Sequence, residues 1–261
     1  VEMGLDGESC NIPVQIEAPL ADAQLEETRP GSDSGLLSSD DVVVITGGAK
    51  GVTAACAIEL ARQFSPKIVL IGRSRLPEDE PAWASGISDP AGLKKAILTH
   101  GFGDGEQPKP ADVEQTYQAI MSSREIHANI REMENQGSPV RYFSADIRTT
   151  SEIKPVFETV REVFGPVTAI IHGAGVKQDK LILDKDTTAF TRVIETKVNG
   201  WETLCRVSEN DPVRFMVAFS SIAGRTGNQG QADYSAANEI LNKSCQKLAA
   251  GNPDCRFASI N

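Results

Sequence analysis

Short apolar runs alternate with helical segments from residue 41 to the end of the 261-residue chain. Several runs, such as residues 42–46, consist largely of β-branched residues, as in strands buried on both faces of a parallel sheet. Strands that alternate with helices build right-handed βαβ units. The sequence therefore predicts an α/β fold with a doubly wound parallel sheet. Its six predicted strands are residues 42–46, 67–72, 140–146, 167–175, 213–221 and 255–261.

One connection between the predicted strands is unusually long. The second and third strands are separated by 67 residues, Arg73 to Pro139, far more than one crossover helix needs. We expect an insertion at about 76–110 that carries a short helix near 90–99. A long helix from about 111 to 136 then makes the crossover. A further helix is expected over 186–207.

The predicted sheet accounts for residues 41–261 and leaves the first forty residues outside it. Residues 1–40 are acidic and rich in turn-forming residues, so we interpret them as a linker or the end of a preceding region. One short strand is expected there, at 12–20. The chain ends at Asn261, directly after the sixth strand, where a lid and a closing edge strand are expected. The interpretation is a C-terminally truncated domain.

Composition excludes several classes of partner. The formal net charge of −10 argues against binding to nucleic acid or to an anionic membrane. No apolar run approaches the length of a membrane span, and the first residues lack the pattern of a signal peptide. The five cysteines and three histidines show no metal-ligand spacing, which indicates reduced, mostly buried thiols and no metal site. We therefore expect a cytoplasmic protein.

A glycine-rich loop follows the first strand. The stretch "TGGAKGVTA" places Gly47, Gly48 and Gly51 between a strand and a helix. Glycines there let the backbone approach a pyrophosphate, and the helix offers free N–H groups to it. The spacing departs from the usual GxGxxG pattern. We nevertheless interpret the loop as the nucleotide site of a Rossmann-type fold, formed by Thr46, Gly47, Gly48, Lys50, Gly51 and Val52.

The end of the second strand favours a phosphorylated cofactor. Arg73 stands where an Asp or Glu usually meets a free ribose 2′-hydroxyl. A guanidinium suits a 2′-phosphate, and Lys50 adds a second cation nearby, so both point to NADPH. Asp146, after the third strand, is placed to accept a hydrogen bond from the adenine amine. The remaining predicted cofactor contacts are Ser74, Ile147, Gly173, Ala174 and Gly175.

A serine and a tyrosine are placed to converge over a nicotinamide. Ser221 ends the fifth strand, and Tyr234 lies thirteen residues later on the next helix. Free tyrosine titrates at about 10, so a tyrosine that donates a proton needs a nearby cation. Lys243 is nine residues past Tyr234, on the opposite helix face, whereas Asn238 shares that face but is uncharged. Lys197, on the preceding helix, remains as a candidate.

These residues carry a resemblance. The stretches "TGGAKGVT", "IHGAGV", "TKVNG", "FSSIAGRTGNQGQADYSAANEI" and "SIN" resemble the ketoreductase domains of type I polyketide synthases, within the short-chain dehydrogenase/reductase superfamily. They are most similar to the domains of polyunsaturated-fatty-acid synthases. In that family the lysine and asparagine exchange places relative to ordinary short-chain reductases. The resemblance therefore implies that Lys197 is the catalytic lysine, with Ser221, Tyr234 and Asn238 completing the site.

The resemblance also implies a substrate and a stereochemical outcome. The substrate would be a β-ketoacyl thioester on the phosphopantetheine arm of an acyl carrier protein, beside neighbouring synthase domains. Domains that give the 3R alcohol often carry Leu-Asp-Asp after the fourth strand, where this chain has Lys177, Gln178 and Asp179. The opposite class often carries a tryptophan where this chain has Thr226. The balance favours 3R.

Two other functions stay open at this point. One is a stand-alone short-chain dehydrogenase that acts on a free metabolite, and the relocated lysine argues against it. The other is a non-catalytic scaffold domain. Such domains usually lose the tyrosine, the serine or the glycine loop, and all three are present in this chain.

Overall fold

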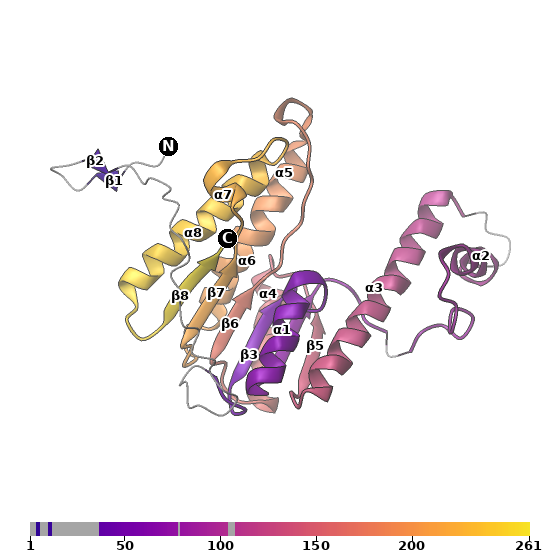
Figure 1. Cartoon of the computed structure of the whole chain (residues 1–261), viewed down its shortest axis with the longest axis horizontal. Helices are drawn as coiled ribbons and strands as arrows, with labels where there is room; N and C mark the ends of the chain where they lie inside the picture. The colour runs from indigo at the N-terminus through magenta and orange to yellow at the C-terminus, as the bar shows by residue number, and fades with distance from the viewer. Residues whose placement is uncertain (1–3, 6–9, 12–36, 78, 104–107) are drawn as a thin grey trace, which may run out of the picture. The chain divides into compact units, whose positions relative to one another are not determined.

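A computed structural model gives the fold of the chain (Figure 1). It describes residues 4–5, 10–11, 37–77, 79–103 and 108–261. The chain divides into two units, Val1–Leu36 and Leu37–Asn261. In the first unit, strand β1 (Gly4–Leu5) pairs antiparallel with β2 (Cys10–Asn11). The strand expected at 12–20 lies outside the described residues.

The second unit is built on a six-stranded parallel sheet with strand order β5-β4-β3-β6-β7-β8. The strands are β3 (Val42–Thr46), β4 (Lys67–Gly72), β5 (Val140–Ser144), β6 (Ala169–His172), β7 (Phe215–Phe219) and β8 (Arg256–Ile260). Every predicted strand is present, and the predicted doubly wound parallel sheet is confirmed. The central strand β3 is buried along its whole length, which explains its continuous run of apolar residues.

Helices cover both faces of this sheet. On one face, α4 (Thr150–Val163), α6 (Gly200–Val207) and α8 (Ala232–Gly251) bury side chains such as Phe157, Trp201 and Leu241 against it. On the other face, α1 (Gly51–Phe64) and α3 (Pro110–Asn135) pack against β3 and β4. Short helical segments η1 (Ile182–Asp184) and α7 (Ala223–Thr226) follow β6 and β7. Because the strands are parallel, their carboxyl ends meet along one edge, where ligands bind in such sheets.

The predicted insertion includes a helix, α2 (Pro90–His100), that packs on the N-terminal half of α3 (Figure 1). Its apolar side chains form a hydrophobic cluster separate from the two that flank the sheet. The buried members of this cluster are Ala84, Leu93, Ile97, Val113 and Ile120. Arg124 of α3 holds the segment before α2 by an ion pair with Glu80 and hydrogen bonds to the backbone oxygens of Ala84 and Ile87.

The helix expected over 186–207 is interrupted. It consists of α5 (Thr187–Ile194), a π-helical turn η2 (Glu195–Asn199) and α6. Wider turns of this kind inside helices are frequent at functional sites, and Lys197 lies in the middle of this one.

The described residues bear on three expectations, which concern buried thiols, metal binding and membrane spans. The expectation of mostly buried thiols was wrong for Cys56, which faces solvent on α1, while Cys205 and Cys255 are half-buried and Cys245 is buried. Among the described residues, no group of acidic, histidine or cysteine side chains is arranged to hold a metal ion. Within the same part of the chain, every helix is too short or too polar to cross a bilayer.

Candidate active site

The glycine-rich loop turns between β3 and α1. Gly47 has a φ of +69°, and a Cβ atom there would lie 2.9 Å from the backbone nitrogen of Ala174. Glycine is therefore needed both for the turn and for the close approach of the two backbones. The Oγ1 atom of Thr46 accepts a hydrogen bond from the Ala174 N–H at 3.2 Å, which fixes that approach. No atom lies within 4 Å of where a Cβ of Gly51 would stand, and Gly51 and Val52 are exposed at the start of α1, whereas Thr53 and Ala54 are buried.

A cavity of about 500 Å³ opens beside this loop, at the carboxyl edge of the sheet. The predicted cofactor residues that line it are Gly47, Lys50, Arg73, Ser74, Ile147, Gly173, Ala174 and Gly175. Ile126, Tyr142 and Thr196 also line it, and the sequence analysis missed them. The Tyr142 hydroxyl donates to the backbone oxygen of Ser74 at 2.8 Å, which anchors the end of β4. Tyr142 lies in the middle of β5, so nothing in its sequence position indicated that it lines the cavity.

Four residues of the predicted loop do not line this cavity: Thr46, Gly48, Gly51 and Val52. A Cβ on Gly48 would come within 2.5 Å of the Ile45 side chain, so this glycine packs into the core under the loop. Val52 is 76% exposed on the first turn of α1. Thr53, near the place of a usual third glycine, instead packs against Gly173, where an added Cβ would meet the Thr53 side chain at 2.5 Å.

The two predicted cations are placed differently. Arg73 is exposed and lines the cavity. Lys50 donates from Nζ to the Ser122 hydroxyl of α3 at 2.8 Å, which draws its charge toward that helix. Beside it, the Gly51 N–H donates to the Glu125 carboxylate at 3.1 Å, so a carboxylate already sits at the start of α1. A helix N-terminus attracts anions, and Glu125 occupies the place of one.

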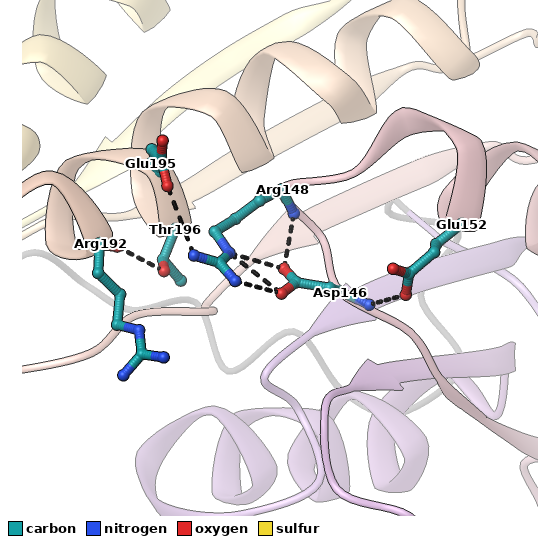
Figure 2. A network of polar contacts seen from close by, with 6 residues as sticks. All are labelled: Asp146, Arg148, Glu152, Arg192, Glu195 and Thr196. Atoms are coloured by element: carbon teal, nitrogen blue, oxygen red, sulfur yellow. Dashed lines mark hydrogen bonds and ion pairs between the residues drawn. The ribbon is translucent and has the colours of Figure 1, made fainter. Parts of the chain in front are cut away.

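Asp146 belongs to a network that the sequence did not predict (Figure 2). Its carboxylate accepts hydrogen bonds from the Arg148 side chain, at 2.6 Å from Nη2 to Oδ2 and 3.0 Å from Nε to Oδ1. These bonds hold the pKa of Asp146 below its usual range. Arg148 also reaches Glu195 in the π turn, at 3.4 Å. The network links the end of β5 to η2, and the adenine contact of Asp146 stays a prediction.

His172 is fully buried at the end of β6 and acts as a structural link. Its Nδ1 lies 2.8 Å from Thr46 Oγ1, and its Nε2 lies 2.9 Å from the backbone oxygen of Lys197. Burial lowers the pKa of His172 to about 3, so the ring is neutral at neutral pH. His172 is therefore a packed residue at the strand end. His172 ties the glycine loop to the π turn.

Lys197 is buried and lies beside Tyr234. Its Nζ is 5.6 Å from the centre of the Tyr234 ring and donates to the backbone oxygen of Phe219 at 2.7 Å. Burial, with a smaller contribution from the charge of Lys177, lowers the pKa of Lys197 to about 8. A Cβ on Gly175 would stand 3.1 Å from Lys197 Cε, so this glycine makes room for the lysine side chain. The structure brings the predicted lysine and tyrosine together.

Asn238 and Ser221 complete the predicted group. Asn238 is fully buried, and its Nδ2 donates to the backbone oxygen of Tyr234 at 2.7 Å, one turn earlier on α8. Its Oδ1 is buried without a hydrogen-bond partner, although a buried acceptor normally has one. Ser221 lies two residues after the end of β7, and its Oγ accepts from the Ala223 N–H at 3.2 Å. Its hydroxyl hydrogen remains available to a ligand at this edge of the sheet.

The arrangement of these residues suits a bound nicotinamide dinucleotide with a carbonyl substrate next to it. Close-packed glycines at the carboxyl edge of the sheet and the Arg73 guanidinium suit a dinucleotide. A tyrosine ring beside a buried ammonium suits proton transfer from the tyrosine to an oxygen.

Comparison with known proteins decides the family. The model of the KR domain matches residues 42–255, which is most of the chain. The chain belongs to the KR-domain family. This is the ketoreductase family of polyketide and polyunsaturated-fatty-acid synthases, whose members are oxidoreductases that use nicotinamide cofactors.

Curated relatives of this KR domain are much longer proteins. It is 38% identical over 222 residues to a polyunsaturated fatty acid synthase subunit of Thraustochytrium sp., a match that covers 82% of the chain and 8% of that protein. It is 28% identical over 209 residues to the polyketide synthase PksL of Bacillus subtilis, covering 78% of the chain and 4% of the relative. The chain thus spans a small part of the multidomain relatives it matches.

Solved structures give the same family and fold. A ketoreductase from the macrolactin assembly line aligns with a TM-score of 0.65 and 27% identity, over 86% of the KR domain and 37% of that chain. A ketoreductase domain from the bacillaene assembly line aligns with a TM-score of 0.61 and 28% identity, over 85% and 43% respectively. Both the resemblance seen in the sequence and the short-chain dehydrogenase/reductase fold are confirmed.

Proposed function

We propose that this KR domain uses NADPH to reduce a β-ketoacyl thioester, carried on the phosphopantetheine arm of an acyl carrier protein, to the β-hydroxyacyl thioester. The observation that carries the proposal is the buried Lys197 ammonium, 5.6 Å from the centre of the Tyr234 ring. Neighbouring synthase domains would supply and remove the substrate, in the cytoplasm. The names of the relatives, which are synthases, support this setting.

The proposed chemistry assigns one task to each side chain. A bound reduced nicotinamide supplies the hydride that adds to the keto carbon. Ser221 donates a hydrogen bond to the keto oxygen and orients it. Tyr234 transfers its hydroxyl proton to that oxygen, and Lys197 stabilises the phenolate that remains until solvent restores the proton. Asn238 holds the α8 backbone at Tyr234 through its bond to the tyrosine carbonyl.

Preference for NADPH over NADH is assigned to Arg73. Its guanidinium is exposed and lines the cavity, and we assign to it the binding of the ribose 2′-phosphate. Arg73→Ala should weaken NADPH binding about tenfold or more and leave NADH binding within about twofold, since a charge-assisted phosphate contact contributes roughly 1.5–3 kcal/mol. Fluorescence titration of both cofactors measures this. Equal weakening for both cofactors would contradict the assignment.

The catalytic assignment is tested by NADPH oxidation with a β-ketoacyl thioester. We expect Lys197→Ala, Tyr234→Phe and Asn238→Ala to lower kcat by about 10²-fold or more, as removal of acid–base groups does. Lys247→Ala is the control, because Lys247 is exposed on the far part of α8. Full turnover by Lys197→Ala would sink the lysine assignment.

The same assay separates the rival functions. A carrier-bound substrate should be reduced with a higher kcat/KM than the same acyl group as a free ketone, and the 3R alcohol should be the main product. Preference for the free ketone would favour a stand-alone dehydrogenase. NADPH binding with no reduction of any carbonyl substrate would favour a scaffold.

A further inference from the structure

A buried ion pair lies next to Tyr234 and has no role in the mechanism above. Lys185 Nζ and Asp233 Oδ1 are 2.7 Å apart, and the two side chains are 2% and 1% exposed. Lys185 also donates to the backbone oxygen of Gln178 at 2.7 Å. Asp233 Oδ1 accepts in addition from the Tyr234 N–H at 2.8 Å. One pair of charges thus contacts both the loop after β6 and the backbone of Tyr234.

Further contacts join the same two segments. The Lys180 N–H donates to the backbone oxygen of Gly230 at 3.0 Å, and Gln231 Nε2 donates to Asp179 Oδ2 at 2.9 Å. The loop of residues 176–186 is therefore fastened at several points to residues 230–233, which lead into Tyr234. We refer to these contacts, with the Lys185–Asp233 pair at their centre, as the loop clamp.

The loop clamp contributes more to the relative position of the two segments than to the stability of the fold. Moving two charges out of water costs desolvation free energy. Apolar side chains of similar volume often stabilise a fold as well as a buried ion pair does, or better. Asp233 Oδ2 is moreover buried without a hydrogen-bond partner, which adds to the cost. A charged pair does, however, fix the separation and direction of the segments it joins. The segment it fixes here carries Lys177, whose Nζ lies 5.2 Å from the centre of the Tyr234 ring.

We propose that Lys185 and Asp233 are positioning residues that set the loop of residues 176–186 against Tyr234 and thereby determine which face of the keto group is presented for reduction. This inference rests on the proposed function and adds a determinant of stereochemical outcome to it. The loop directly follows Gly175, which lines the cofactor cavity, and its Lys177 Nζ is 5.2 Å from the centre of the ring of the proposed proton donor, Tyr234. Neither Lys185 nor Asp233 lines that cavity, so cofactor binding should be independent of the pair.

The test is the double variant Lys185→Met/Asp233→Asn. It removes both charges together, so no uncompensated charge is left buried, and the new side-chain amide keeps an oxygen for the Tyr234 N–H. Lys180→Met is the control, because the side chain of Lys180 is exposed and the loop clamp uses only its backbone N–H, which the substitution keeps. With a β-ketoacyl thioester we expect kcat/KM to fall about 10- to 100-fold, as small misplacements near a reacting group do. The ratio of the two product enantiomers should fall as well, and the Kd for NADPH should stay within about twofold of wild type.

The outcomes separate this inference from the function on which it rests. An unchanged enantiomer ratio and an unchanged kcat/KM in the folded double variant would overturn the loop clamp. Retained turnover in Tyr234→Phe would instead overturn the proposed function. If the double variant does not fold, Asp233→Glu is the second test. It keeps both opposite charges but lengthens the acidic side chain by one methylene group. A lower enantiomer ratio in Asp233→Glu supports the proposal, and a wild-type ratio contradicts it.

Discussion

At the scale of single residues, the buried environment of Lys197 determines its protonation state. Burial and the neighbouring Lys177 charge bring the pKa of Lys197 down to about 8. The ammonium form, which stabilises the phenolate, is thus the majority form at neutral pH and is lost as the pH rises through that value. Sequence spacing could exclude Lys243 and leave Lys197 as a candidate. It could not show that the side chain is buried, because burial depends on contacts with Phe219 and Gly175 from distant parts of the chain.

Removal of the Lys177 charge should move the alkaline limit of activity. A nearby cation disfavours the protonated form of Lys197, so Lys177→Met raises the pKa of Lys197. The fall in kcat/KM on the alkaline side should therefore move to higher pH. Steady-state rates across pH 6 to 10 measure this, with Lys180→Met as the control. An alkaline limit of kcat/KM that is unchanged or lies at lower pH in Lys177→Met would contradict the prediction.

At the scale of elements, the sequence predicted the strands well and one helix incompletely. Six short apolar runs were sufficient for the sheet. The central run at β3 is buried on both faces and needs only apolar residues, whereas the edge strands β5 and β8 also carry exposed positions. The helix over 186–207 has no residue that marks the π turn at Glu195–Asn199. That turn is held by partners far away in sequence, such as His172 and Arg148. The Lys185–Asp233 pair was missed for the same reason, since its members are 48 residues apart.

The helix after the π turn lies unusually close to β6. A Cβ on Gly200 would stand 3.0 Å from His172 Cε1 and 3.2 Å from the Ile147 side chain. Alanine normally stabilises a helix interior by about 1 kcal/mol relative to glycine. We expect Gly200→Ala to destabilise instead, by about 1–3 kcal/mol, because of overpacking. Urea unfolding measures the free energy, and Gly251→Ala, where no atom crowds an added Cβ, is the control. Stabilisation by Gly200→Ala would show that α6 can move away from β6.

At the scale of the sheet unit, Leu37–Asn261, two kinds of core coexist. The sheet has hydrophobic clusters on both faces, whereas the α2 segment has its own small cluster on the outer part of α3. The sequence located this insertion by its length alone. Its packing could not be predicted, because the segment 79–89 is held both by apolar contacts of Trp83, Ala84 and Ile87 with the α2 cluster and by Arg124 of α3, and its sequence does not reveal these partners.

Arg124 should therefore control the attachment of the insertion without controlling the fold of the sheet. We expect Arg124→Ala to increase limited proteolysis within residues 79–103 several-fold, because local opening of a small cluster costs less than global unfolding. The midpoint of the main unfolding transition should stay within about 2 °C, since the sheet clusters are untouched. Arg131→Ala, an exposed arginine on the same helix, is the control. Equal proteolysis of both variants would contradict the role of Arg124.

Helix α3 has a consequence that follows from its length. At about 1.5 Å per residue, its 26 residues form a rod of roughly 39 Å. Val113 and Ile120, in the first half of the rod, are buried in the α2 cluster, while Ile126 and Met133 belong to the sheet core. Ile126 also lines the cofactor cavity. A partner that binds at the α2 end of this helix would therefore be mechanically coupled to the cofactor cavity. A force on α2 would be transmitted along α3 to the residues that line the cavity.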